Sequence, residues 1–100
     1  MWFEVITVRT ARPDLVKPLL RELAAIPEES CDAALTSFAC YRNLDIENEM
    51  GIRLAWDARK VSASRTRTGV LIAKWLERYG MVHHSTWTLT FHYTGKNFSP

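Results

Sequence analysis

The chain has 100 residues, of which 47% are hydrophobic and 24% charged, values that are ordinary for one soluble globular domain. Its formal net charge of +2 is too small to indicate nucleic-acid binding by itself. No apolar run approaches the ~20 residues of a membrane span, and "MWFEVITVRT" lacks the basic start and long apolar run of a signal peptide. We expect a cytoplasmic protein that binds neither nucleic acid nor membrane.

The first predicted element is a strand over residues 2–8, which is rich in aromatic and β-branched side chains. It is apolar on both faces, with Phe3 and Val5 on one and Trp2, Ile6 and Val8 on the other. A strand of this kind is buried on both faces.

Residues 12–26 predict a helix, because apolar residues recur there at helical spacing. Pro13 suits a helix start, and Pro18 is tolerated only in a first turn. The helix therefore begins near Asp14 or Leu15, or it bends at Pro18.

Two strands follow, over residues 31–44 and 51–58, joined by an acidic turn. Cys31 and Cys40 would lie ~30 Å apart on one strand at ~3.3 Å per residue. A disulfide needs α-carbons within about 7 Å. We therefore expect two free thiols and a reducing compartment.

The second helix is expected from Val61 to Tyr79, with Gly69 allowing a break. The clearest strand is 81–94, where apolar and polar residues alternate. We expect residues 1–94 to form a single domain and 95–100 a loose tail.

This order, β-α-β-β-α-β, predicts an α+β ferredoxin-like fold, a four-stranded antiparallel sheet with both helices on one face. The other face would be open and would carry Trp2, Ile6 and Val8. Such a patch calls for a cover, and a two-fold homodimer through the open sheet face is the simplest one.

The stretch "YRNLDIENEMGIRLAW", residues 41–56, followed by "DARKVSAS", is similar to the central hairpin and following helix of the antibiotic biosynthesis monooxygenase family. The element order fits along the whole chain. The resemblance implies a dimeric α/β barrel with a pocket between sheet and helices in each subunit. Some members of that family oxidise aromatic intermediates with O₂ and no cofactor, and others degrade haem.

Two departures argue against haem degradation. Many family members carry a His nine or ten residues after the third-strand Trp, where this chain has Arg65 and Thr66. The haem-degrading members also use an Asn on the first strand, and this strand has none. Arginine cannot replace histidine as an axial ligand. We expect no metal and no organic cofactor.

Three residues are candidates for catalysis. Trp56 would position a flat aromatic substrate, although a strand tryptophan is as readily a core residue. Arg65 would stabilise the substrate anion, unless it is a solvated helix-end arginine. His83 would accept the proton, unless it is only a strand-end histidine.

A second set of candidates would bind the substrate by lining an aromatic pocket: Phe38, Tyr41, Trp75 and Trp87. As a group they could equally be core. The histidines do not predict a metal site, because His83 and His84 point to opposite faces of one strand and His84 and His92 lie ~27 Å apart along it.

The leading hypothesis is a small dimeric monooxygenase-like protein that acts on an aromatic or conjugated molecule. The alternative is a dimer without catalytic activity, which senses a ligand or docks an acidic partner through the basic residues between Arg59 and Arg78. An enclosed pocket with convergent polar groups would favour the enzyme, and an accessible basic face the docking module.

Overall fold

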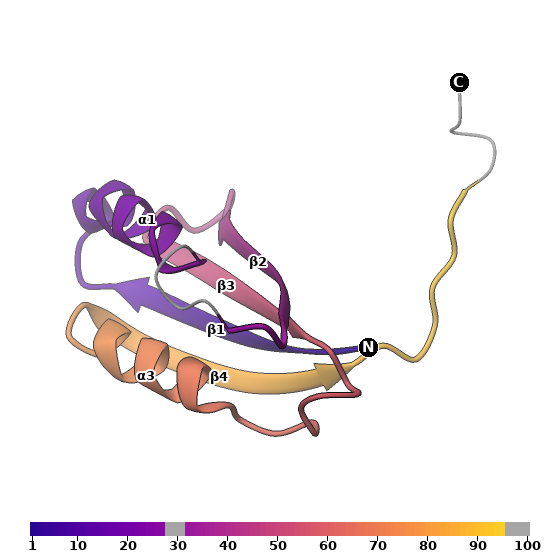
Figure 1. Ribbon diagram of the computed structural model, residues 1–100. Coiled ribbons are helices and arrows are strands. Elements are labelled where there is room, and N and C mark those ends of the chain that lie inside the picture. Colours follow the sequence, from indigo (N-terminus) through magenta and orange to yellow (C-terminus); the bar gives the residue numbers. More distant parts are fainter. Residues whose placement is uncertain (28–31, 96–100) are drawn as a thin grey trace.

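The computed structural model describes residues 1–27 and 32–95. One antiparallel sheet of four strands, in the order β2-β3-β1-β4, carries both helices on one side (Figure 1). The elements in chain order are β1 (Trp2–Thr10), a 3₁₀ turn (Pro13–Leu15), α1 (Val16–Ala24), β2 (Leu35–Arg42), β3 (Glu49–Trp56), α3 (Arg67–Leu76) and β4 (Gly80–Thr88). The predicted ferredoxin-like arrangement is confirmed.

The core lies between the sheet and the two helices. The central strands β1 and β3 each point one set of side chains toward the helices. The apolar faces of α1 and α3 pack against these side chains. The buried residues that form this core cluster are Trp2, Ile6, Val8, Val16, Leu19, Leu23, Ala34, Met50, Ile52, Leu54, Trp56, Ile72, Ala73 and Leu76. The open face of the sheet carries the alternate residues of each strand.

The expectation for the open face is wrong. Trp2, Ile6 and Val8 are 3%, 0% and 1% exposed, because they lie under the helices. Phe3 and Val5 face the open side and are half-buried. Alternation along a strand separates its side chains into two faces, but both faces of β1 are apolar, so the pattern does not say which one the helices cover.

The last strand is shorter than predicted. β4 ends at Thr88, which pairs with Trp2, the first residue of β1. Beyond it, the Leu89 N–H donates to the Met1 carbonyl, and the chain leaves the sheet (Figure 1). A strand needs a neighbour to hydrogen-bond with, and β1 has ended here. Leu89, Phe91 and Tyr93 are consequently exposed.

The second helix starts later than predicted, whereas α1 starts next to the expected Leu15. α3 begins at Arg67 instead of Val61, because Thr66 caps it by accepting a hydrogen bond from the Gly69 N–H. α1 begins at Val16, and Pro18 falls in its first turn, where a backbone N–H has no partner inside the helix.

The second strand is also shorter than predicted, and part of the expectation is untested. β2 covers Leu35–Arg42, whereas 31–44 was expected. Cys31 and residues 96–100 of the expected tail lie outside the described residues. Among the residues the structure does describe, Cys40 forms no disulfide. No helix in the described part of the chain is long and apolar enough to cross a membrane.

Candidate functional site

A buried carboxylate lies at the centre of the molecule. Glu4 is on the helix-facing side of β1, between Trp2 and Ile6, and its side chain is 0% exposed. Burying a charge is costly unless hydrogen bonds replace the lost water. The surroundings of Glu4 provide those hydrogen bonds.

Both oxygens of Glu4 accept hydrogen bonds. Oε2 accepts from Trp56 Nε1 at 2.8 Å and from Thr66 Oγ1 at 2.6 Å. Oε1 accepts from the Thr66 backbone N–H at 2.9 Å and contacts His84 Nε2 at 2.8 Å. Glu4 thereby joins β1 to β3, to β4 and to the start of α3.

The donors around Glu4 assign the proton of His84. The indole N–H and the backbone N–H can only donate. The Thr66 hydroxyl already accepts from the Gly69 N–H, so its own hydrogen points at Glu4. An ionised Glu4 accepts from all four donors, and His84 Nε2 then carries the proton that it donates. In neutral His84 the other ring nitrogen, Nδ1, keeps its lone pair.

Gly69 is required beside this carboxylate. A Cβ at position 69 would overlap the Glu4 carboxylate, which reaches the first turn of α3. The glycine lets Glu4 approach the N-terminus of the helix, where a negative charge is favourable. The break that the sequence indicates at Gly69 is therefore a close approach inside the helix.

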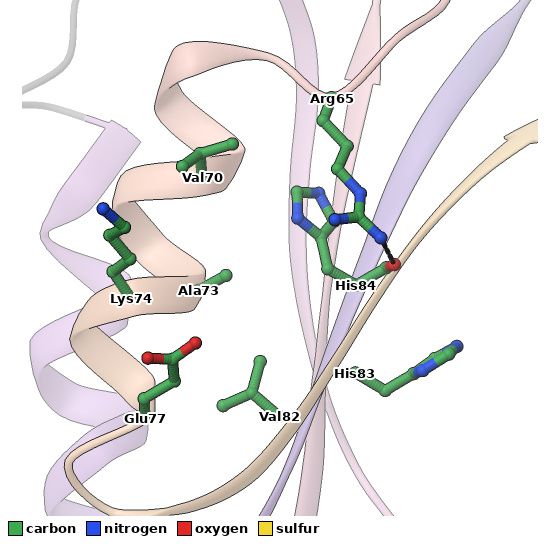
Figure 2. A pocket seen from close by; sticks show the side chains of 8 residues that line it. All are labelled: Arg65, Val70, Ala73, Lys74, Glu77, Val82, His83 and His84. Carbon is green, nitrogen blue, oxygen red and sulfur yellow. Dashed lines mark hydrogen bonds between the residues drawn. The ribbon is translucent and has the colours of Figure 1, made fainter.

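A hollow of about 350 Å³ lies between α3 and β4, next to this cluster. Val70, Ala73 and Glu77 project into it from α3, and Val82 and His84 border it from β4 (Figure 2). The remaining lining residues are Arg65, Lys74 and His83. Arg65 reaches across from the loop before α3, and its Nη2 donates to the His84 carbonyl at 3.0 Å. The hollow opens to solvent, since Arg65, Lys74 and Glu77 are exposed.

The three predicted catalytic residues do not meet at one point. Trp56 is 2% exposed, stacks on Trp2 with ring centroids 6.3 Å apart and binds Glu4, so it lies behind the hollow. Arg65 does border the hollow. The ring of His83 points away from α3, toward the open face of the sheet (Figure 2), and the histidine on the same side as Trp56 is His84.

The predicted substrate-binding aromatics are spread over the molecule. Phe38 packs against the core, and Trp75 lies edge-to-face with Tyr79 and borders a groove with Glu22. Tyr41 and Trp87 are exposed on the open face, on opposite edge strands. The structure does not bring these four residues into one pocket.

Sequence reasoning missed Glu4 and His84. The available signal was a carboxylate in the otherwise apolar stripe of Trp2, Ile6 and Val8, a position that needs a buried partner. The sequence offers His84 only as a possible metal ligand. Its partner is 80 positions away in the chain, so no local spacing connects the two.

The loop that carries Arg65 starts at an exposed ion pair. Arg59 Nε lies 3.2 Å from Asp57 Oδ1, and the hydrogen bond from the Arg59 side chain lowers the pKa of Asp57.

On the inner side of β2, burial raises the pKa of the Cys40 thiol. In residues 1–27 and 32–95, no three His, Cys, Asp or Glu side chains form a group able to hold a metal ion.

Comparison with known proteins supports the fold. No family model and no curated protein matches the sequence. Among solved structures, one described as an antibiotic biosynthesis monooxygenase is 11% identical, with a TM-score of 0.61 over 90% of this chain and 99% of its own. SnoaB, described as a cofactor-independent oxygenase from Streptomyces nogalater and solved as a mutant, is 15% identical, with a TM-score of 0.59 over 91% and 93%.

A third similar structure is Rv0793 from Mycobacterium tuberculosis, which is 17% identical, with a TM-score of 0.60 over 94% of this chain and 100% of its own. At these identities the likeness concerns the backbone alone. It confirms at the level of the fold the resemblance seen in the sequence: the chain has the fold of the antibiotic biosynthesis monooxygenases.

Proposed function

We propose that this protein is a small-molecule oxygenase that acts on an aromatic or conjugated substrate without a metal or organic cofactor. One observation carries the proposal: a histidine oriented by a buried carboxylate, and a cationic arginine, border the same hollow. Base and cation together suit the formation of a substrate anion. The similar structure described as a cofactor-independent oxygenase supports the reaction class.

His84 would remove the proton. Glu4 holds the Nε2–H, so Nδ1 is the ring nitrogen that can accept a proton from the substrate, and Glu4 stabilises the imidazolium that forms. The proposal thus moves the predicted role of His83 to its neighbour. Glu4 is a positioning residue, as is Trp56, whose indole holds Glu4 in place.

Arg65 would stabilise the anion that O₂ attacks. For a substrate with a reactive CH₂ group, the overall reaction R₂CH₂ + O₂ → R₂C=O + H₂O balances without an external reductant. The substrate anion gives an electron to O₂, the two radicals combine to a peroxide, and the peroxide loses water. The guanidinium remains charged throughout and favours the anionic forms.

We further propose that the protein works as a homodimer through its open sheet face. Phe3 and Val5 are half-buried there, and Trp87 is 55% exposed. The apolar side chains of residues 89–94 project beyond the sheet with no strand beside them in the described structure. A second copy would cover both surfaces. Light scattering across a dilution series tests this proposal, and a monomer at all concentrations would contradict it.

The docking alternative has less support. Arg59 is engaged with Asp57, and Arg65 lies over the His84 carbonyl at the hollow. Two of the basic residues between Arg59 and Arg78 are therefore already engaged within the chain. A location in the reducing cytoplasm stays a prediction.

Oxygen consumption with a series of anthrones, which carry a reactive CH₂ group, tests the proposed reaction. His84→Gln keeps an amide donor for Glu4 but removes the basic nitrogen, and it should lower kcat by about 10²–10⁴-fold, as for loss of a general base. His83→Gln is the matched control and should retain turnover. The assignment fails if His83→Gln is inactive while His84→Gln is active, and the function fails if no substrate in the series consumes O₂.

A further inference from the structure

We infer that the hollow between α3 and β4 selects a flat aromatic molecule with an anionic group at one end and a neutral hydroxyl at the other, with Arg65 binding the anion and Glu77 the hydroxyl. The inference rests on the proposed function for the location of the site and adds the class of substrate. It follows from the charges at the two ends of the hollow and the apolar residues between them.

The Arg65 end suits an anion. One hydrogen bond to the His84 carbonyl holds the guanidinium at the hollow and leaves its other N–H donors for a ligand. Within the described residues, no carboxylate lies within 4.0 Å of Arg65 to form a salt bridge, whereas Arg9, Arg12 and Arg59 each have one. A carboxylate or an ionised hydroxyl matches the planar fork of the guanidinium.

The opposite end suits a hydrogen-bond donor. The Glu77 carboxylate points into the hollow, whereas the Lys74 side chain extends away from it (Figure 2). In the described structure Glu77 has no salt-bridge partner. A carboxylate accepts a hydrogen bond from a neutral hydroxyl and repels a second anionic group.

The stretch between the two ends is apolar and of suitable length. Val70, Ala73 and Val82 line it. Glu77 is the C-cap residue of α3 and lies seven positions after Val70, about 10 Å along a helix axis at 1.5 Å per residue. The volume of about 350 Å³ is near the lower end of ligand pockets, about 300–1,000 Å³. A fused two-ring aromatic fits these limits better than a larger polycycle.

Four naphthalenes test the selection, with binding measured by titration calorimetry on the whole chain: 6-hydroxy-2-naphthoate, 2-naphthoate, 2,6-naphthalenedicarboxylate and 2-naphthol. We expect the hydroxy acid to bind most tightly, the naphthoate next, and the dicarboxylate and the naphthol at least about tenfold more weakly than the hydroxy acid, equivalent to about 1.4 kcal/mol. Equal affinity for all four, or no binding of any, would overturn the inference.

Variants assign each end. Arg65→Ala should weaken binding of the hydroxy acid about tenfold or more. Arg67→Ala removes the same charge two positions away and outside the hollow, so it should leave this affinity unchanged. Glu77→Gln should raise the affinity for the dicarboxylate, so that the dicarboxylate no longer binds more weakly than the naphthoate. An equal loss of affinity in Arg65→Ala and Arg67→Ala would mean that the overall positive charge, and not a specific contact with Arg65, attracts the ligand. That result would overturn the site.

Binding and turnover fail separately. If the naphthalenes bind in the expected order but no substrate consumes O₂, the selectivity stands and the oxygenase proposal falls. If O₂ is consumed but binding ignores Arg65 and Glu77, the ends of the hollow do not select the substrate. Circular dichroism of each variant confirms that the exposed substitutions leave the fold intact.

Discussion

The two helices cover the same face of the sheet but are attached to it differently. α1 packs through Val16, Leu19 and Leu23, and no side chain of the described residues caps its start. α3 also packs through apolar residues, but its start is capped by Thr66 and held against the buried Glu4. Of the two buried polar residues in the described structure, the charged one, Glu4, lies at α3, whereas Thr10 lies before the turn that leads into α1.

The difference indicates where function resides. A buried carboxylate held by several donors is weak evidence for stability, because well-packed apolar residues often serve as well. It does orient its partners, and His84 is one of them. The α1 half packs through apolar residues alone, while the α3 half carries the arrangement for which we propose a chemical role.

The largest expected effect comes from breaking the α3 attachment at its centre. Glu4→Ala leaves the Trp56 indole, the Thr66 N–H and His84 buried without their acceptor. Removing one partner of a buried polar cluster costs about 3–5 kcal/mol. Urea denaturation measures the loss, and amide exchange should show added opening in α3 and not in α1. A loss below about 1 kcal/mol would mean that the cluster is not essential to the attachment.

The second prediction separates helix propensity from close approach. Gly69→Ala should stabilise a helix interior by about 1 kcal/mol on propensity alone. Its Cβ would overlap the Glu4 carboxylate, and overpacking costs about 1–3 kcal/mol. We expect net destabilisation by thermal unfolding, with Thr68→Ala as the neighbouring control. Stabilisation of Gly69→Ala would show that Glu4 can move aside.

The third prediction gives the α1 end the cap that it lacks. Arg12 precedes the 3₁₀ turn in extended conformation without a side-chain cap hydrogen bond from the described residues. Arg12→Asn supplies a capping side chain and should stabilise by about 0.5–1 kcal/mol. The exposed Arg12–Asp14 pair that is lost contributes little. Arg12→Ala controls for the loss of that pair, with stability measured as the midpoint of thermal unfolding. An equal midpoint for Arg12→Asn and Arg12→Ala would contradict the capping explanation.

The smallest effect concerns Cys40 in the α1 half. Burial raises the pKa of this thiol, so the folded state disfavours the thiolate. In Cys31→Ser protein, iodoacetamide should alkylate Cys40 more slowly in the folded state than in urea. The rate for the folded protein should rise with pH at a higher pH than the rate for a free thiol. Stability should be unaffected below the pKa of the unfolded thiol and fall as pH rises above it. Alkylation at the unfolded rate would contradict burial.

Much of the fold was predictable because it depends on local patterns. Periodicity predicts β1 and α1, and Pro13 and Pro18 indicate where α1 begins. The order of the elements then predicts the ferredoxin-like sheet. The end of β4 was not predictable, because residues 89–94 continue the alternation of a strand. The end depends on where β1 begins in the adjacent chain segment.

The site was harder to predict for a related reason. The more apolar face of β4 carries Trp87 and lies on the open side, while its polar face, with His84, lies inward. The usual assignment of apolar residues to the interior therefore fails on this strand. Arg65, whose catalytic role stays a prediction, borders the hollow, whereas His83 lies on the other side of the sheet from Trp56.

The number, type and order of the elements follow from the amino-acid sequence, because hydrophobic periodicity and helix-capping residues act over a few positions. The folded structure is needed to see which face of each strand is covered and that Glu4 contacts Trp56, Thr66 and His84. These contacts join residues 52 to 80 positions apart. Their partners are set by strand pairing and helix packing, which no local spacing records.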